Sequence, residues 1–255
     1  MTRRAVVEQV MGLPVSLHLD GPEAESPATH RAVAEAFAVL HEADDRFTTY
    51  RDDSEVMRLR DGRLDLADAS PDVHEVLRLC DLARERTGGL FDAYLPDADG
   101  RRVLDPSGLV KGWAAARAAR VLDGVPGLAY SLNAGGDVVV GGQAPRAWRI
   151  GIEDPRDRSR VLFVVERSAG AVATSGTAAR GAHLVDPRAG GRPAGLLAVT
   201  VVGESLMWAD VLATAAFVRG PDAVEWVSRQ LGYAALAVHA DGVVEADPSL
   251  LPPAR

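Results

Sequence analysis

Hydrophobic positions recur with two different periods along the chain, and the period separates the predicted strands from the predicted helices. Between residues 13 and 19 apolar and polar residues alternate, which is the period of a half-buried strand. Ser26-Pro27 predicts the start of a helix, with serine as the N-cap and proline in the first turn. The same signal at Ser70-Pro71 predicts a second helix, which Gly88-Gly89 ends.

The middle of the chain is rich in short β-branched segments. A third, alanine-rich helix is expected from about Lys111 to Leu122, entered through Gly108. Strands separated by Gly, Pro, Asp and Arg are then expected at 128–132, 138–140, 148–152, 161–166, 170–174 and 196–202. We expect the charged segment 153–160 to be a hairpin loop.

Helices and a hairpin are expected at the C-terminal end. The helices cover 210–219 and 223–231, and a glycine closes each of them. Residues 236–239 and 243–245 flank Ala240-Asp241-Gly242, which predicts a hairpin. Because helices group with runs of neighbouring strands, the pattern favours the α+β class with antiparallel sheets. No linker-like composition divides the chain, so we expect a single domain over residues 1–255.

Composition narrows the classes of function. A formal net charge of −8 disfavours nucleic acid and anionic membranes as partners. The first eight residues lack an apolar run of secretory length, and no stretch approaches the length of a membrane span. We therefore expect a cytoplasmic protein with no membrane anchor. The single cysteine, Cys80, lies on the apolar side of its helix and predicts a buried thiol.

Asp210 and Thr214 stand four residues apart, so on a helix their side chains share one face. A carboxylate with a hydroxyl offers the hard oxygen ligands that Mg²⁺ prefers. The alternative is structural: an acid near a helix start complements the helix dipole, and Thr214 packs.

Lys111 is the only lysine among 28 basic residues. A point charge between small residues suits a phosphate group, which a protein of net charge −8 must attract locally. A solvated helix residue is the alternative interpretation.

Two further segments could surround a ligand. Asn133-Ala134-Gly135-Gly136-Asp137 joins two predicted strands, and its glycines allow either a close approach to a ligand or an ordinary hairpin turn. Thr174-Ser175-Gly176 ends a strand and offers two hydroxyls. His183 follows, either as a base or as a structural residue. A hydrolase using Ser175, His183 and Asp137 or Asp186 lacks the G-x-S-x-G elbow.

Taken in order, these segments resemble the ApbE family of flavin transferases. The matching segments are Met11-Gly12, 47–56, 87–92, Asp105 to Gly112, Asn133 to Asp137, Thr174 to Gly176, His183 to Pro187 with Gly190 or Gly191, and Asp210 to Thr214. The resemblance implies a T-fold-like α+β structure with helices packed outside antiparallel sheets.

The resemblance also implies the chemistry. Asp210, Thr214 and the backbone carbonyl of Val110 would bind Mg²⁺, and His183, Asp210 and Lys111 would act in catalysis. The residues implied to bind FAD are Met11, Tyr50, Asp105, Lys111, Asn133, Gly135, Gly136, Asp137, Thr174, Ser175, Gly176 and His183. Met11 and Tyr50 would lie near the flavin or adenine rings.

The implied activity is the transfer of FMN from FAD to a threonine or serine of an acceptor protein, with release of AMP. Two alternatives stay open. One is an FAD pyrophosphatase, in which water replaces the acceptor hydroxyl at the same Mg²⁺ site. The other is a non-catalytic FAD-binding or carrier protein.

Overall fold

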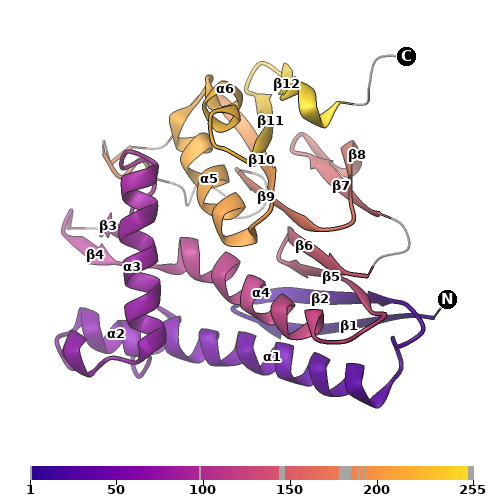
Figure 1. Cartoon of the computed structure of the whole chain (residues 1–255). Helices are drawn as coiled ribbons and strands as arrows, with labels where there is room; N and C mark the ends of the chain where they lie inside the picture. The colour runs from indigo at the N-terminus through magenta and orange to yellow at the C-terminus, as the bar shows by residue number, and fades with distance from the viewer. Residues whose placement is uncertain are drawn as a thin grey trace.

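An eight-stranded antiparallel sheet organises the computed structural model (Figure 1). The structure describes residues 2–97, 99–143, 147–177, 185–188, 190–191 and 193–251. The strands follow the order β1 (Arg3–Val10), β2 (Leu13–Asp20), β5 (Ala129–Ala134), β6 (Asp137–Gly142), β9 (Gly170–Gly176), β10 (Leu196–Gly203), β11 (Ala234–His239) and β12 (Val244–Ala246). The expected α+β, T-fold-like class with antiparallel sheets is confirmed.

Helices cover one face of this sheet. The helices α4 (Ser107–Asp123) and α5 (Leu206–Arg219) contact its central strands, and α1 (Pro27–Phe47) packs against α4. The remaining helices are α2 (Glu55–Arg60), α3 (Pro71–Arg86) and α6 (Ala223–Ser228), with 3₁₀ turns at Leu66–Asp68 and Pro248–Leu250. The main hydrophobic core lies between the sheet and these helices and draws residues from Val10 to Ala237.

A hairpin of β7 (Trp148–Asp154) and β8 (Asp157–Arg167) packs on the opposite face. It encloses a smaller core of Val138, Val140, Ile150, Ile152, Val165, Val172 and Val202. A second hairpin, β3 (Tyr94–Pro96) with β4 (Arg102–Leu104), precedes α4. None of the helices in the described ranges is long and apolar enough to cross a membrane.

Helix α6 ends at Ser228 and not at residue 231, and two further boundary predictions were wrong. The segment 153–160 is mostly strand, because only Pro155-Arg156 joins β7 to β8. The Arg156 guanidinium donates to both oxygens of Asp154 and closes this tight turn. At the other boundary α5 begins at Leu206, with Ser205 as its cap. Asp210 therefore lies in the second turn of α5, and the dipole argument for an acid at the helix start does not apply to it.

The Ser-Pro signals marked two helix starts correctly. Ser26 accepts a hydrogen bond from the Thr29 amide at 3.2 Å, and α1 begins at Pro27. Helix α3 begins at Pro71, although the Ser70 side chain makes no capping bond. The edge strand β1 was not expected, because its apolar residues share the segment with the charged Arg3, Arg4 and Glu8.

Cys80 is buried on α3, with 4% of its surface exposed. Burial raises the pKa of its thiol to about 12, since a thiolate loses its solvation there. At pH 8 the folded protein therefore holds almost no thiolate. We expect iodoacetamide to leave Cys80 unmodified in the folded protein at pH 8 and to alkylate it within minutes in denaturant, as read by mass spectrometry. Equal alkylation rates in both conditions would contradict the burial.

Candidate functional site

Lys111, Asp137 and Asp210 meet where α4 and α5 pass the start of β6. The Lys111 Nζ atom contacts Asp137 Oδ2 and lies 3.5 Å from Asp210 Oδ1. Only 17% of the Lys111 side chain is exposed, and the carboxylates are buried further, at 2% and 6%. One ammonium therefore lies between two buried carboxylates and offsets part of the cost of burying them.

Gly112 lets α4 and α5 approach this closely. A Cβ atom at Gly112 would stand 2.9 Å from the Met207 Cα and 3.2 Å from both the Cβ and Oδ2 atoms of Asp210. The backbone of α4 therefore touches the α5 turn that carries Asp210. This contact places Lys111, the preceding residue, beside the same carboxylate.

Asp137 joins three elements of the site. It begins β6, its Oδ2 atom contacts Lys111 of α4, and its Oδ1 atom accepts the Thr174 amide of β9 at 2.9 Å. The Thr174 hydroxyl bonds the hydroxyl of Thr200 in β10 at 2.8 Å. Thr174 thus contributes its backbone to Asp137 and its side chain to a different partner.

Ser175 connects β9 to α5. Its Oγ atom lies 3.1 Å from the Oγ1 atom of Thr214, one helical turn after Asp210. Asp210 and Thr214 share one face of α5, as the spacing predicted, and the rest of that helix is mainly apolar and buried. The Thr214 hydroxyl is therefore oriented by a fixed neighbour in the sheet.

The segment 133–137 forms the hairpin turn between β5 and β6. Gly135 and Gly136 have φ angles of 63° and 106°, and the Gly136 amide donates to the Asn133 side chain at 2.8 Å. The Gly135 amide also donates to the Pro14 carbonyl at 3.2 Å. This turn therefore lies next to the β1–β2 hairpin.

Met11 lies in the turn of that neighbouring hairpin and has a φ of 55°. It is the one non-glycine residue in the described ranges with a positive φ. Such a conformation costs about 1 kcal/mol or more and needs support from its surroundings. The support comes from α1, because the Met11 amide donates to the Asp44 carboxylate at 2.9 Å. The hydrogen bond thus holds the backbone of this turn in its strained conformation.

Tyr50 lies just beyond the same end of α1. It is 96% exposed, and its amide donates to the Thr48 hydroxyl at 3.3 Å. Phe47, in the last turn of α1, packs edge-to-face on Trp113 of α4 with ring centroids 5.6 Å apart. Through this contact the Met11 and Tyr50 end of α1 adjoins the Lys111 turn of α4.

Asp105 and Val110 belong to the start of α4. The Asp105 side chain accepts the Ser107 amide at 3.0 Å, and its own amide donates to the Ala93 carbonyl at 2.6 Å. Asp105 thus fixes where α4 begins. Val110 is buried one residue before Lys111.

The remaining predicted site residues lie near β9 and after it. Gly176 has no room for a side chain, because a Cβ there would stand 2.7 Å from the Leu197 carbonyl oxygen. His183 lies outside the described residues. After it, the Asp186 amide donates to the Gly191 carbonyl at 2.8 Å, and the Gly190 amide donates to the Asp186 carbonyl at 2.8 Å.

The oxygen donors of Asp210 and Thr214 suit a hard cation whose coordination shell also holds oxygens from other ligands. Within the described ranges, no group of three His, Cys, Asp or Glu side chains could hold a metal ion. Asp210 and Thr214 supply one carboxylate and one hydroxyl, which fit Mg²⁺ because this ion keeps waters and phosphate oxygens in its shell. They do not form a complete cage, so the site fits an ion that arrives with a phosphate ligand.

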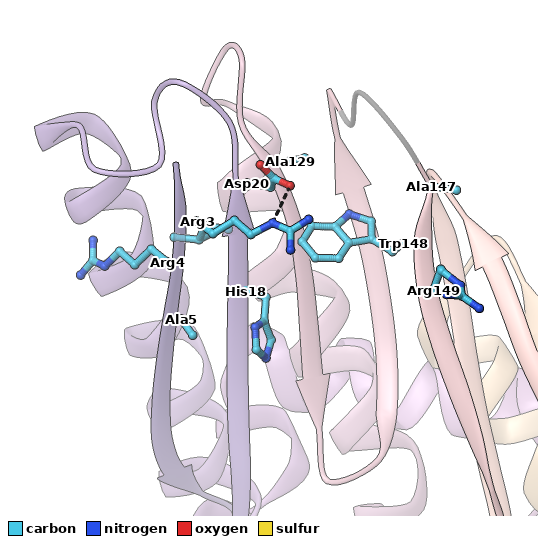
Figure 2. Close-up of a pocket in the computed structure, with 10 residues that line it drawn as sticks. Arg3, Arg4, Ala5, His18, Asp20, Ala129, Ala147, Trp148 and Arg149 are labelled. Atoms are coloured by element: carbon cyan, nitrogen blue, oxygen red, sulfur yellow. Dashed lines mark hydrogen bonds and ion pairs between the residues drawn. The ribbon is translucent and has the colours of Figure 1, made fainter. Parts of the chain in front are cut away.

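A hollow of about 570 Å³ lies away from these residues (Figure 2). Arg3, His18, Asp20 and Trp148 line it, and the Arg3 Nε atom donates to Asp20 at 3.2 Å. Asp20 pairs with Ala129 of β5, and Ala129 pairs with Gly142 of β6, which lies an odd number of positions from Asp137 along that strand. Side chains alternate along a strand, so this hollow opens on the face opposite to Asp137.

Three contributors to the site were not predicted from the sequence. Asp44 supports Met11, Thr200 bonds Thr174, and Ser205 caps the helix that carries Asp210. Ser205 carried a readable signal, since a serine preceding an apolar helix is a typical N-cap. The other two are joined to their partners only by the fold.

The close approach at Gly112 gives a stability prediction. We expect Gly112→Ala to lower the free energy of unfolding by about 1–2 kcal/mol, because overpacking against α5 outweighs the gain in helix propensity. Gly124→Ala, at the end of the same helix, is the control, since its Cβ would meet only an ordinary contact at 3.5 Å. Denaturant titration measures both variants. Equal stability of the two would contradict a tight contact between α4 and α5.

Comparison with known sequences places these residues in a family. The sequence model of the ApbE family matches residues 11–99 and 95–237. An FAD:protein FMN transferase of Rhodobacter capsulatus is 33% identical over 129 residues, covering 47% of this chain and 25% of the relative. Another, of Klebsiella pneumoniae (strain 342), is 29% identical over 182 residues, covering 63% of this chain and 51% of the relative. The chain thus spans about half or less of the length of these curated relatives.

Solved structures agree on the fold. The ApbE protein from Thermotoga maritima superposes with a TM-score of 0.82 at 22% identity, covering 97% of this chain and 98% of the other. The Pseudomonas stutzeri flavinyl transferase ApbE, in its apo form, gives 0.79 at 25% identity, covering 97% and 95%. With the family match running from residue 11 to residue 237, the chain belongs to the ApbE family.

Proposed function

We propose that this protein transfers FMN from FAD to a threonine or serine hydroxyl of an acceptor protein in a Mg²⁺-dependent reaction. The observation that carries the proposal is the grouping of Lys111, Asp210 and Thr214 where α4 and α5 meet. A cationic side chain beside hard oxygen donors suits a diphosphate with its metal ion. The names of the curated relatives support the same reaction class.

The donors assigned to Mg²⁺ are the Asp210 carboxylate, the Thr214 hydroxyl and the backbone carbonyl of Val110. The bound ion would offset the negative charge of the FAD diphosphate during transfer. The Ser175 contact supports this assignment: if Thr214 donates its proton to Ser175, the Thr214 lone pairs face away from β9 and are available to a cation.

The reaction joins the acceptor hydroxyl oxygen to the phosphorus on the flavin side of FAD. The bond from that phosphorus to the bridging oxygen breaks, AMP leaves with the bridging oxygen, and the hydroxyl proton passes to a base. Lys111 directs its positive charge toward the phosphates, and His183 is the candidate base. The product is an FMN phosphoester on the acceptor protein.

The proposed FAD site extends from the metal donors to the end of α1. Met11 and Tyr50 would flank a ring of FAD, because a residue with a constrained backbone and an exposed aromatic ring lie at the same end of α1. The remaining contacts are assigned to Asp105, Asn133, Gly135, Gly136, Asp137, Thr174, Ser175, Gly176 and His183. The Thr174 and Ser175 hydroxyls already bond Thr200 and Thr214. We therefore propose that Thr174 and Ser175 shape the end of β9 against FAD and that their hydroxyls do not bind it.

The function is tested by following both products. We expect the protein, FAD and Mg²⁺ to release AMP slowly alone and faster with a flavinylation acceptor, whose mass increases by one FMN less one water. Mass spectrometry and chromatography of AMP measure the two products. AMP formation at a rate that no acceptor changes would instead indicate an FAD pyrophosphatase. FAD that stays intact under all conditions would indicate a non-catalytic FAD-binding or carrier protein.

Variants of α5 test the assignment of the metal donors. We expect Asp210→Asn to lower the transfer rate at least about 100-fold, because loss of a buried anionic ligand removes charge stabilisation. Thr214→Val should cost about tenfold, since a water can replace a neutral ligand. Asp222→Asn is the control, because Asp222 pairs with Arg219 on the surface beyond the same helix. Wild-type transfer by Asp210→Asn at limiting Mg²⁺ would refute the assignment.

A further inference from the structure

The two edges of the eight-stranded sheet differ in length. The last strand, β12, has three residues, whereas the first strand, β1, has eight. β1 contains no proline, and its pairing with β2 runs from Arg3 to Val10 without a bulge. In the ranges that the structure describes, no strand pairs with the outer side of β1. A long and regular edge is a template for another strand unless a proline, a bulge or a covering element blunts it.

The backbone groups on the outer side of β1 belong to its odd-numbered residues. The Gly21 amide donates to the Thr2 carbonyl at 3.2 Å, and bonded pairs alternate with non-bonded pairs along antiparallel strands. The even-numbered residues of β1 therefore direct their amides and carbonyls to β2, and the odd-numbered residues direct theirs outward. Val7, one of these odd-numbered residues, has a side chain that is 60% exposed. The edge thus offers both outward backbone groups and an apolar surface.

Arg4 and Glu8 give this edge a self-complementary charge pattern. They lie two residues before and two residues after Val6, so their side chains share one face of the strand. The Arg4 side chain extends past β1 on the side away from β2 (Figure 2), and its buried Nη1 atom has no hydrogen-bond partner among the described residues. The Glu8 Oε2 atom lies 2.9 Å from His41 of α1, and the second carboxylate oxygen can accept from an arginine.

We propose that β1 is the interface at which two copies of this chain pair antiparallel, with Val6 of one copy opposite Val6 of the other. This register places Arg4 of each copy opposite Glu8 of the other copy. Pairings centred one residue to either side would place Arg4 opposite a valine instead. The inference is independent of the proposed function, because it uses none of the residues assigned to FAD or to Mg²⁺.

The backbone pattern is compatible with this register. In an antiparallel pair, opposite residues either bond each other or both do not, so an outward-facing residue must lie opposite another one. With Val6 at the centre, Ala5 lies opposite Val7 of the other copy, and both belong to the outward-facing set. Arg4 and Glu8 then form a non-hydrogen-bonded pair, in which the side chains lie closer together. Opposite charges in a cross-strand pair stabilise the pairing, and like charges directly opposite destabilise it.

Sedimentation equilibrium of the whole chain tests the interface. We expect the wild type to reach twice the monomer mass at concentrations up to about 100 µM, since weak interfaces have dissociation constants in the micromolar range. Glu8→Arg should raise the dissociation constant at least about tenfold, because two arginines then lie opposite each other at both ends of the pairing. Glu25→Arg is the matched control: Glu25 also pairs with a histidine of α1, His30, but lies outside β1. Its dissociation constant should equal that of the wild type.

Exchanging the two charges separates a specific register from general damage to the strand. Arg4→Glu should weaken the dimer as Glu8→Arg does, whereas Arg4→Glu/Glu8→Arg restores opposite charges across the interface and should dimerise like the wild type. A double variant that is as monomeric as the single variants would overturn the register.

A backbone variant tests the strand pairing itself. Val7→Pro removes an outward amide and leaves the bonds to β2 in place, because a proline is tolerated where the amide of an edge strand faces solvent. It should raise the dissociation constant at least about tenfold, since the donor to the other copy is lost. A wild type that stays monomeric at the highest concentration would overturn the proposal. A dimer that Val7→Pro and Glu8→Arg both leave unchanged would place the interface elsewhere and overturn it as well.

Discussion

The site depends on the contact between α4 and α5 at Gly112. Without a side chain at this position, the two helices approach until the backbone of one touches the Met207 and Asp210 turn of the other. The two helices thus bring a lysine and a carboxylate close together, and the start of β6 adds Asp137. Lys111, Asp137 and Asp210 are all carried by regular elements, which hold geometry more firmly than loops do.

Burial explains why these charges occur together. An isolated carboxylate taken out of water costs several kcal/mol, and Asp137 and Asp210 are both largely enclosed. Lys111 offsets one negative charge, so the three groups retain a formal charge of −1. Under the proposed function, that residual charge favours a divalent cation over a free phosphate, and the nucleotide would then bind together with its metal ion.

Most helices and strands were predicted correctly, because their sequence signals lie within the element or directly beside it. Ser-Pro caps and alternating polarity required only a few neighbouring residues, as α1, α3 and β2 illustrate. The start of α5 was placed four residues late, because the apolar residues before Asp210 carry no polar face to mark a helix. The spacing of Asp210 and Thr214 was readable, whereas the Met11–Asp44 and Thr174–Thr200 contacts join residues that only the fold brings together.

The choice of lysine at position 111 follows from the same geometry. An arginine would present a planar fork suited to two parallel hydrogen bonds, and it would tie itself to one carboxylate. A lysine ammonium can contact Asp137, remain 3.5 Å from Asp210, and turn toward a phosphate with a small rotation of its stem. A chain with 28 basic residues has its one lysine at this point. Under the proposed function, this is the position where a movable point charge would lie beside both a metal ligand and a phosphate.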